Sequence, residues 1–448
     1  MAFSKLASAT RRQKDTGLLA LLGIGALALL SSCANNSNTS SQNQDAGSPG
    51  GDGGQVVDTR PTTCSVPPVS IAHSAGYSIS TSNKVFVDTK QFPLAVCNDG
   101  SPALFSIRPG FGAAQNRWII FLDGGASCID AATCTARATD TPDLISSNGY
   151  QTNPFDTNFG VISPDPAKNP DLFDATVVRI HYCSSDGWTG NKAGDPNKPG
   201  VIPDSWHWRG HEIIKGVVQT LKANHNFNQA SELLFVGSSA GGVGVFTNLG
   251  WLSQNIPATT RLVAATDAGF LNEVAGYDVS QSDGVSKAPG TPYDAVHPIQ
   301  VSLWGSSGDI FCEAKAVTQT DRIHCGIGPL LVAKDTGWVR VPMFIRQSLA
   351  DGVQLKQEGL DIQSNPPKQQ LQGYELFFSQ QMRNAMAAAN NFVTTFAGLD
   401  TIHGEMDSSL YSQKSYLFGT SPNQVTLRIV DALGIWYKAP CQLNQWVQ

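Results

Sequence analysis

The chain has few charged residues and no basic cluster. Lysine, arginine, aspartate and glutamate make up 15% of its 448 residues, and the formal net charge is −6. No lysine- or arginine-rich segment is interleaved with aromatic side chains, so the chain lacks the electrostatic footprint of a nucleic-acid-binding protein. Histidine and acidic residues are nowhere spaced like metal ligands, and we expect neither a metal nor an organic cofactor.

Long hydrophobic runs are also scarce. The run Leu18–Leu30 is short for a membrane span and has the length of a signal-peptide core. It follows four basic residues and leads into Ser31-Ser32-Cys33, which resembles a bacterial lipobox. We therefore expect Cys33 to be lipidated and to anchor the protein in the cell envelope, at the outer membrane because Ala34 follows it. The alternative is ordinary cleavage and secretion.

The remainder divides into a polar segment and one large domain. Residues 34–60 contain almost nothing apolar and cannot offset the entropy of ordering the chain, which predicts a disordered tether. Residues 61–448 show no internal repeat and are predicted to form a single catalytic domain, which we expect to be monomeric. Eight cysteines remain beside Cys33, and an even number in an exported chain indicates disulfides. Two pairs are close enough in sequence to close small loops: Cys128 with Cys134, and Cys312 with Cys325.

Alternating strand and helix patterns predict an α/β fold with a mostly parallel sheet covered on both faces. Short apolar runs indicate strands at 118–122, 175–180, 233–236, 261–265 and 342–346, and helical patterns cover 210–223 and 379–391. In such sheets the chemistry lies at the carboxyl ends of the strands. Three long polar segments, 145–170, 190–203 and 279–297, are expected to form loops over that edge.

One turn in this pattern favours a nucleophile. Gly237-Ser238-Ser239-Ala240-Gly241 lies between the run 233–236 and a helical pattern at 243–252. A G-x-S-x-G sequence between a buried strand and a helix is typical of a nucleophile elbow, with Ser239 lifted out of the backbone. The N–H of Ala240, at the start of the helix, would then face an oxyanion. The alternative is a plain strand-to-helix turn.

A serine nucleophile requires a base and an orienting carboxylate, in the chain order serine, acid, histidine. Three histidines follow Ser239: His297, His324 and His403. We expect His403 to be the base because it comes late in the chain, just after the helical pattern. Asp351 and Asp267 each follow a predicted strand and are equal candidates for the acid, and Asp400 is a third.

The loop after the strand 118–122 supplies candidate oxyanion donors. It reads Asp123-Gly124-Gly125-Ala126-Ser127-Cys128, and consecutive glycines allow backbone N–H groups to turn toward a bound oxygen. A tight turn braced by a disulfide would use the same residues, and both descriptions can hold together.

These motifs, taken in order, resemble the pectin acetylesterase family over residues 96–403. The resemblance rests on six elements: 123–128 with Cys134 and Arg137, 182–190, Trp208-Arg209-Gly210, 237–242, Asp267-Ala268-Gly269, and His403. It implies an α/β-hydrolase fold, with Ser239 as nucleophile and His403 as base. It also implies that the acid is Asp351 and not Asp267.

The same resemblance implies an oxyanion hole and a further disulfide. The donors would be the N–H groups of Gly125, Ala126 and Ala240, and Cys97 would pair with Cys183. The family usually has an aromatic residue where this chain has Ala126, so the acyl pocket is either more open or closed by another side chain. Trp188 is the candidate for that wall, with core packing as the alternative.

Together these features predict an extracytoplasmic serine carboxylic-ester hydrolase. Its expected reaction is the removal of acetyl groups from an acetylated polysaccharide such as pectin. A lipid-acyl or aryl esterase is the alternative within the hydrolases, and an inactive carbohydrate-binding surface protein is the alternative outside them.

Overall fold

The computed structural model describes residues 58–73, 81–152, 154–272, 300–357, 368–420, 422–442 and 445–448, with the backbone alone at 368–375. The predicted signal peptide, Cys33 and the tether up to residue 57 lie outside the described residues. So do His297 and the whole of the predicted loop 279–297. In the described ranges, no helix is long and apolar enough to cross a bilayer.

The core of the domain is a nine-stranded sheet in the order β1-β2-β4-β3-β5-β6-β7-β8-β11. Its strands are β1 (Asn83–Phe86), β2 (Leu104–Arg108), β3 (Arg117–Leu122), β4 (Thr176–Ile180), β5 (Glu232–Ser238), β6 (Arg261–Asp267), β7 (Met343–Arg346), β8 (Val393–Ala397) and β11 (Gln445–Val447). β2 is antiparallel to both of its neighbours, and every pairing from β4 to β11 is parallel. The predicted mostly parallel sheet is confirmed.

All five predicted strands are present, whereas β1, β2, β8 and β11 were not predicted. β8 has the sequence VTTFA, and its two threonines interrupt the apolar run on which the prediction depended. Both threonines are buried within the sheet. Threonine is β-branched and is enriched in strands, so β-propensity would have predicted β8 better than hydropathy did.

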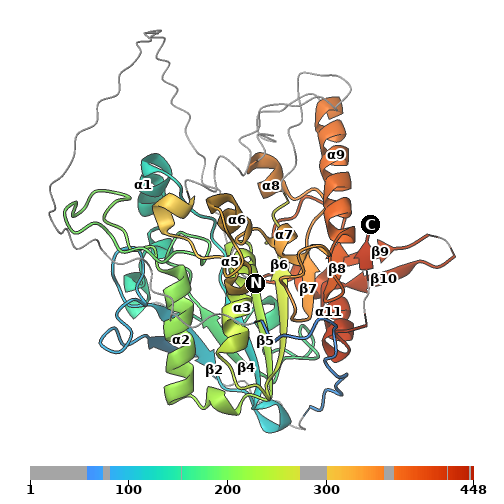
Figure 1. Ribbon diagram of the computed structural model, residues 1–448. Coiled ribbons are helices and arrows are strands. Elements are labelled where there is room, and N and C mark those ends of the chain that lie inside the picture. Colours follow the sequence, from blue (N-terminus) through green and yellow to red (C-terminus); the bar gives the residue numbers. More distant parts are fainter. Residues whose placement is uncertain are drawn as a thin grey trace, which may run out of the picture. The chain divides into compact units, whose positions relative to one another are not determined.

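Helices cover both faces of the sheet, as the alternation of side chains along the strands requires. In β3, Ile120 and Leu122 pack into one core, which also holds side chains of α2 (Gly210–Asn224) and α3 (Ala240–Gln254). Ile119 and Phe121 point to the other core, which includes α11 (Ile429–Lys438). Figure 1 shows α3 running alongside β5, the strand that it follows.

The remaining elements lie between and after these strands. They are α1 (Ala131–Asp140), α5 (Ile310–Glu313), α6 (Gln319–His324), α7 (Gly328–Val332), α8 (Gly352–Gln357), α9 (Lys368–Ala387), α10 (Leu410–Gln413), and a hairpin of β9 (Ser415–Phe418) and β10 (Val425–Arg428). The helix predicted at 379–391 is α9, which begins eleven residues earlier and ends four residues earlier than predicted.

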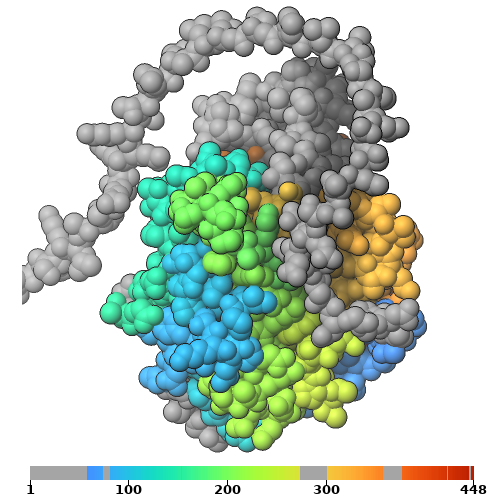
Figure 2. Space-filling model, turned by 60° about the vertical axis from the view of Figure 1, so that its left-hand side comes forward, coloured from blue at the N-terminus to red at the C-terminus, as the bar shows by residue number. Residues whose placement is uncertain are grey.

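Close packing holds the first part of the domain against α2. A side chain at Gly216 of α2 would place its Cβ 2.5 Å from the Cβ of Ala95, so only glycine fits there. Figure 2 shows this face, with the blue segment around residue 100 beside the green segment that follows residue 200. In the sheet beside α2, β3 and β4 carry one wall of the site described below.

Candidate active site

Ser239 lies in a strained turn between β5 and α3. Its φ and ψ are 56° and −120°, which a non-glycine residue adopts only when the surroundings impose it. A Cβ at Gly237 would lie 2.3 Å from the carbonyl oxygen of Gly241, and a Cβ at Gly241 would lie 2.0 Å from that of Leu122. Both glycines are therefore required for the close approach of β3, β5 and α3. This is the geometry that the G-x-S-x-G sequence predicted.

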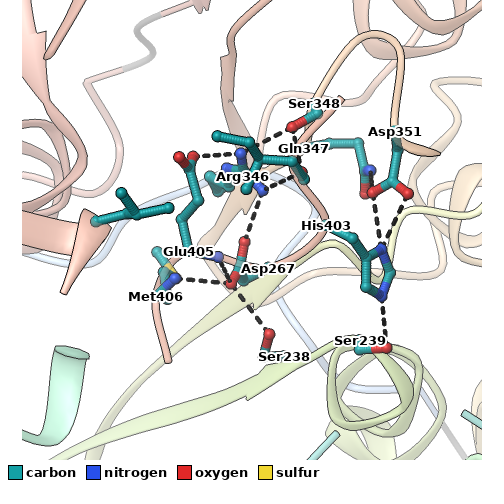
Figure 3. A network of polar contacts seen from close by, with 12 residues as sticks. Ser238, Ser239, Asp267, Arg346, Gln347, Ser348, Asp351, His403, Glu405 and Met406 are labelled. Atoms are coloured by element: carbon teal, nitrogen blue, oxygen red, sulfur yellow. Dashed lines mark hydrogen bonds and ion pairs between the residues drawn. The ribbon is translucent and has the colours of Figure 1, made fainter. Parts of the chain in front are cut away.

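Three side chains form a continuous hydrogen-bonded chain at the carboxyl ends of the strands (Figure 3). Nε2 of His403 lies 2.7 Å from Oγ of Ser239. Nδ1 of His403 lies 2.9 Å from each carboxylate oxygen of Asp351. The structure thus brings together Ser239, His403 and Asp351, in the order that nucleophile, base and orienting acid require.

Asp351 is fully buried, and its carboxylate oxygens accept several hydrogen bonds. Nε2 of Gln347 donates to it at 2.8 Å, and the backbone N–H groups of Val353 and Gln354, at the start of α8, donate at 2.9 and 3.2 Å. Burial lowers the pKa of His403, but the hydrogen bond and the negative charge of Asp351 outweigh it, so the pKa lies above its usual value. The imidazole is consequently a stronger base than a free histidine.

Asp267, the competing acid, faces a different partner. Its Oδ2 accepts hydrogen bonds from the backbone N–H groups of Glu405 and Met406 at 2.7 and 2.8 Å, and from Oγ of Ser238 at 3.1 Å. Its Oδ1 lies 3.2 Å from the guanidinium of Arg346 (Figure 3). The imidazole of His403 therefore contacts Asp351, whereas Asp267 is engaged by Arg346, Ser238 and backbone N–H groups.

Arg346 connects this network to the segment that carries His403. The guanidinium is fully buried and pairs with the carboxylates of Asp267 and Glu405. It also donates to Oγ of Ser348, which in turn contacts Asp400. Because two carboxylates and a guanidinium compensate one another in the interior, the loop after β8 is fixed against the ends of β6 and β7. His403 is positioned by that loop.

The glycine-rich loop after β3 lies beside the nucleophile. A Cβ at Gly124 would lie 3.0 Å from the Cβ of Ser239, and Gly125 and Ala126 have φ values of 145° and 54°. Positive φ at consecutive residues turns their N–H groups to one side of the loop. Gly125, Ala126 and Ala240 all line the cavity that contains Ser239, which places the three predicted oxyanion donors around the same space.

A buried arginine on α1 orients this loop. Nη1 of Arg137 donates to the carbonyl oxygen of Gly125 at 2.7 Å, and Nε donates to Oγ of Ser185 at 2.7 Å. In a trans peptide the C=O and the following N–H point in opposite directions. The bond from Arg137 therefore directs the N–H of Ala126 to the other side of that peptide. The disulfide Cys128–Cys134 ties α1 to the loop.

Ser239 and His403 open into a cavity of about 930 Å³. It is lined by residues that follow β3, β4, β5 and β6, by Val243 and Phe246 of α3, and by α6 with the segment up to α7. Tyr150 and Phe159 of the predicted loop 145–170 also line it, as expected for a loop over the site. The predicted loop 190–203 contributes no lining residue among those described, so its expected place over the site is wrong.

Trp188 does not line the cavity, and its assignment to the substrate pocket is wrong. The side chain is fully buried, its Nε1 donates to the backbone oxygen of Asp123 at 3.0 Å, and Gly244 of α3 packs against its ring. The neighbouring residues Gly187 and Thr189 face the cavity instead. Core packing, the alternative at the sequence level, is what the structure has.

Four disulfides connect the eight cysteines of the described region. Cys97–Cys183, Cys128–Cys134 and Cys312–Cys325 are the predicted pairs. Cys64–Cys441 joins residues 377 positions apart, a pairing that sequence spacing left open. The disulfides are consistent with an extracellular protein. Within the described ranges, no group of three or more histidine, cysteine, aspartate or glutamate residues is arranged to hold a metal ion.

Five aspartate and arginine residues that line the cavity were given no role from the sequence: Asp123, Arg179, Asp186, Arg322 and Asp407. Arg179 had a detectable signal, because it is a charge near the end of the apolar strand β4. Asp407 had none, since it belongs to an irregular segment four residues after His403. Of the candidate histidines, His324 is the last residue of α6. The imidazole that contacts Ser239 is that of His403.

The chain is similar to known carboxylesterases. The palmitoleoyl-protein carboxylesterase NOTUM of Schmidtea mediterranea is 27% identical over 80% of this chain, and human NOTUM is 27% identical over 65%. The matches cover 64% and 55% of those proteins, so the chain spans less than two thirds of their length. The crystal structure of the Drosophila Wnt deacylase Notum superposes with a TM-score of 0.65 at 24% identity, covering 83% of this chain and 96% of that one.

The structural match shows an α/β-hydrolase type of fold, which confirms the predicted fold class. The family model for pectinacetylesterases matches residues 78–445, which is most of the chain and includes the elbow, the glycine-rich loop and His403. The chain therefore belongs to the pectinacetylesterase family.

Proposed function

We propose that this protein is a serine carboxylic-ester hydrolase that removes acetyl groups from an acetylated polysaccharide such as pectin. The observation that carries the proposal is the chain of hydrogen bonds from Ser239 through His403 to Asp351, at the base of a large cavity. Membership of the pectinacetylesterase family supports the ester class.

The geometry provides each step of a two-stage hydrolysis. Oγ of Ser239 attacks the ester carbonyl while Nε2 of His403 takes the proton, and Asp351 stabilises the imidazolium. The N–H groups of Ala126 and Ala240 donate to the resulting oxyanion. The C–O bond to the alcohol then breaks, and His403 returns the proton to the leaving oxygen. Water attacks the acyl-serine by the same route, which releases the carboxylic acid and regenerates Ser239.

The second candidate function is an esterase that removes a longer acyl group, and the size of the cavity favours it. Its volume of about 930 Å³ is far larger than an acetyl group needs, and Val243, Phe246 and Leu271 give it apolar surface. The absence of an aromatic side chain at Ala126 leaves that surface open. The NOTUM relatives are named as palmitoleoyl-protein carboxylesterases, which is a long-chain activity.

The test is acetate release from acetylated pectin and acetylated xylan, run beside p-nitrophenyl esters of increasing chain length. Ser239→Ala serves as the inactive reference, and Asp165→Asn, which changes an exposed carboxylate in a loop, serves as the control variant. Serine-dependent acetate release from a polymer supports the deacetylase. Serine-dependent turnover of only long-chain esters replaces it with the second candidate, and equal activity of wild type and Ser239→Ala rejects the serine mechanism.

We further infer that the protein is exported and attached to the cell envelope through Cys33. The support is the lipobox-like sequence ahead of a polar segment, together with four disulfides in the domain. Incorporation of labelled palmitate that is lost in Cys33→Ala tests the anchor. Release of the Cys33→Ala protein into the medium with its activity intact is the expected result, and unlabelled wild type would reject lipidation.

A further inference from the structure

The cavity above Ser239 has two walls of different chemistry. In the sheet, β3 and β4 lie on one side of β5, whereas β6 and β7 lie on the other. The wall on the β6 side, completed by α3 and the start of α7, carries apolar side chains: Val243, Phe246, Ala268, Leu271 and Ile327. Arg322 of α6 also lines the cavity. The wall on the β3 and β4 side carries rings and charges, and we call it the polar wall: Asp123, Tyr150, Phe159, Arg179 and Asp407.

Arg179 is the fixed centre of the polar wall. Nε donates to Oδ1 of Asp123 at 2.8 Å, and Nη1 donates to the backbone oxygen of Asp156 at 3.0 Å. The guanidinium carbon lies 4.0 Å and 4.8 Å from the ring centroids of Phe155 and Phe159. A guanidinium has five N–H donors, and these two bonds use two of them. The stacked, half-buried group is therefore preorganised and retains donors for a ligand.

Two carboxylates place acceptors next to the nucleophile. Asp123 immediately precedes Gly124, where an added Cβ would lie 3.0 Å from the Cβ of Ser239. Asp407 opens into the cavity from the His403 loop. Partial desolvation and the nearby charge of Asp267 raise the pKa of Asp407 to about 6. A carboxyl of this kind accepts hydrogen bonds from hydroxyl groups.

Two half-buried aromatic rings complete the polar wall. The ring of Tyr150 packs edge-on against His181 at 4.7 Å and Phe155 at 5.1 Å, and the ring of Phe159 packs against Phe121 at 5.6 Å. These contacts fix the rings while both still line the cavity. Rigid rings provide an apolar surface at low entropic cost, which suits the C–H face of a sugar ring.

The charge of the polar wall distinguishes neutral from acidic sugars. Arg179 contributes one positive charge, and it is already paired with Asp123. Asp407 adds a second carboxylate, and burial lowers the pKa of the adjacent His181, which keeps that ring neutral. A uronate carboxylate would meet net negative charge here, whereas neutral hydroxyl groups meet both donors and acceptors.

We propose that the polar wall is a leaving-group subsite that binds a neutral sugar unit through Arg179, Asp123 and Asp407, with Tyr150 and Phe159 as its apolar platform. The inference rests on the proposed function and narrows it: the acyl group lies toward the apolar wall, and the alcohol from which it is released is a neutral saccharide, as in acetylated xylan, and not the galacturonate of the pectin backbone. Bidentate and charge-assisted contacts to hydroxyl groups set the orientation of the ester oxygen above Ser239.

Steady-state kinetics tests the subsite with two leaving groups. Acetylated xylo-oligosaccharide requires the polar wall, whereas p-nitrophenyl acetate has a small leaving group that does not span it. For Asp407→Asn and Tyr150→Leu, we expect kcat/KM on the oligosaccharide to fall about tenfold more than kcat/KM on the aryl ester, mostly through KM. Asp165→Asn, which changes an exposed carboxylate that is not among the lining residues of the cavity, is the matched control and should leave the ratio unchanged.

Direct binding separates the subsite from the chemistry. Calorimetric titration of Ser239→Ala with unacetylated xylotetraose and with tetragalacturonate measures the alcohol side alone. We expect the neutral oligosaccharide to bind at least about tenfold more tightly, and Asp407→Asn in the same background to weaken it. Equal or tighter binding of the uronate, or equal losses on both substrates in the kinetic assay, would overturn the proposal.

The failure of the proposed function has a different signature. If the wild-type protein does not hydrolyse p-nitrophenyl acetate in a Ser239-dependent manner, the hydrolase proposal fails, whatever the titrations show. If it hydrolyses that ester but the ratio between the two substrates is unchanged in Asp407→Asn and Tyr150→Leu, the subsite alone is rejected.

Discussion

Arg137 is predicted to control the rate of the reaction without touching the substrate. Its hydrogen bond to the carbonyl oxygen of Gly125 fixes the peptide whose other end is the N–H of Ala126. Arg137→Met keeps most of the side-chain volume but removes every donor. The Gly125–Ala126 peptide is then free to rotate, because both residues have positive φ and the loop is half exposed. Arg137 is in this sense a positioning residue.

The expected loss follows from what the peptide does in the transition state. Removing an oxyanion donor outright costs about 100- to 1,000-fold in kcat, and a misoriented N–H that can still return costs less, about 10- to 100-fold. KM should change little, because the ground-state carbonyl does not need this donor. Two charge-assisted hydrogen bonds are also lost from a buried site, which lowers the free energy of unfolding by about 2–4 kcal/mol.

The assay is turnover of p-nitrophenyl acetate by protein shown to be folded by circular dichroism. Arg428→Met, which breaks an exposed ion pair at the start of α11, is the matched control and should keep its kcat. Arg137→Lys should recover only part of the activity, since one ammonium group does not reproduce the guanidinium fork that reaches Gly125 and Ser185. Added guanidinium should raise kcat in Arg137→Ala.

A folded Arg137→Met protein with wild-type kcat would refute the reasoning. So would a loss that appears only in KM, because that pattern indicates weaker substrate binding and not a misplaced oxyanion donor. Destabilisation without a change in kcat would leave Arg137 with a purely structural role.

Three further predictions concern the rest of the site. Asp351 raises the pKa of His403, and only the neutral imidazole accepts the serine proton, so the acid limb of the pH profile of kcat/KM should have its midpoint above about pH 6.5. Asp351→Asn should lower that midpoint and reduce kcat by about 10,000-fold. Asp267→Asn should lower the free energy of unfolding by about 2–4 kcal/mol in urea titrations and reduce kcat through the His403 loop, whereas equal stability would contradict the role of the network. Replacing Cys64 and Cys441 together by serine should cost about 2–4 kcal/mol of stability with kcat preserved, and a change in kcat would show that this disulfide reaches the site.

Local patterns predicted the parts of the site that depend on local geometry. The elbow at Ser239 needs an apolar strand, a helix and two glycines within a few residues, and all of these can be read directly from the sequence. The glycine-rich loop after β3 could likewise be predicted from a local pattern, because consecutive glycines follow an apolar strand. By contrast, Trp188 was assigned to the pocket as a substitute for the aromatic residue that the family has at the position of Ala126, yet the residues on either side of it face the cavity instead. Which of three consecutive side chains points inward depends on a positive φ, 66° at Trp188, and the sequence does not show that.

The choice between Asp267 and Asp351 illustrates what spacing alone cannot decide. Both residues follow adjacent strands, and both lie near the loop that carries His403. The register of β6 and β7 pairs Asp267 with Arg346, so the buried guanidinium neutralises that carboxylate first. Asp351 lies five residues beyond Arg346, where backbone N–H groups and the imidazole are its partners.

The sequence did contain a usable signal for this choice. A charged residue that ends the apolar strand β7 must find a buried partner, because an unpaired guanidinium in the interior costs several kcal/mol. Once β6 and β7 are accepted as neighbours, Asp267 is the carboxylate directly across from Arg346, and the remaining acid is left for the histidine. Charge compensation within the sheet therefore identifies Asp351 as the acid that orients the histidine. Spacing along the chain considers each residue separately and had left two candidates, which only the resemblance separated.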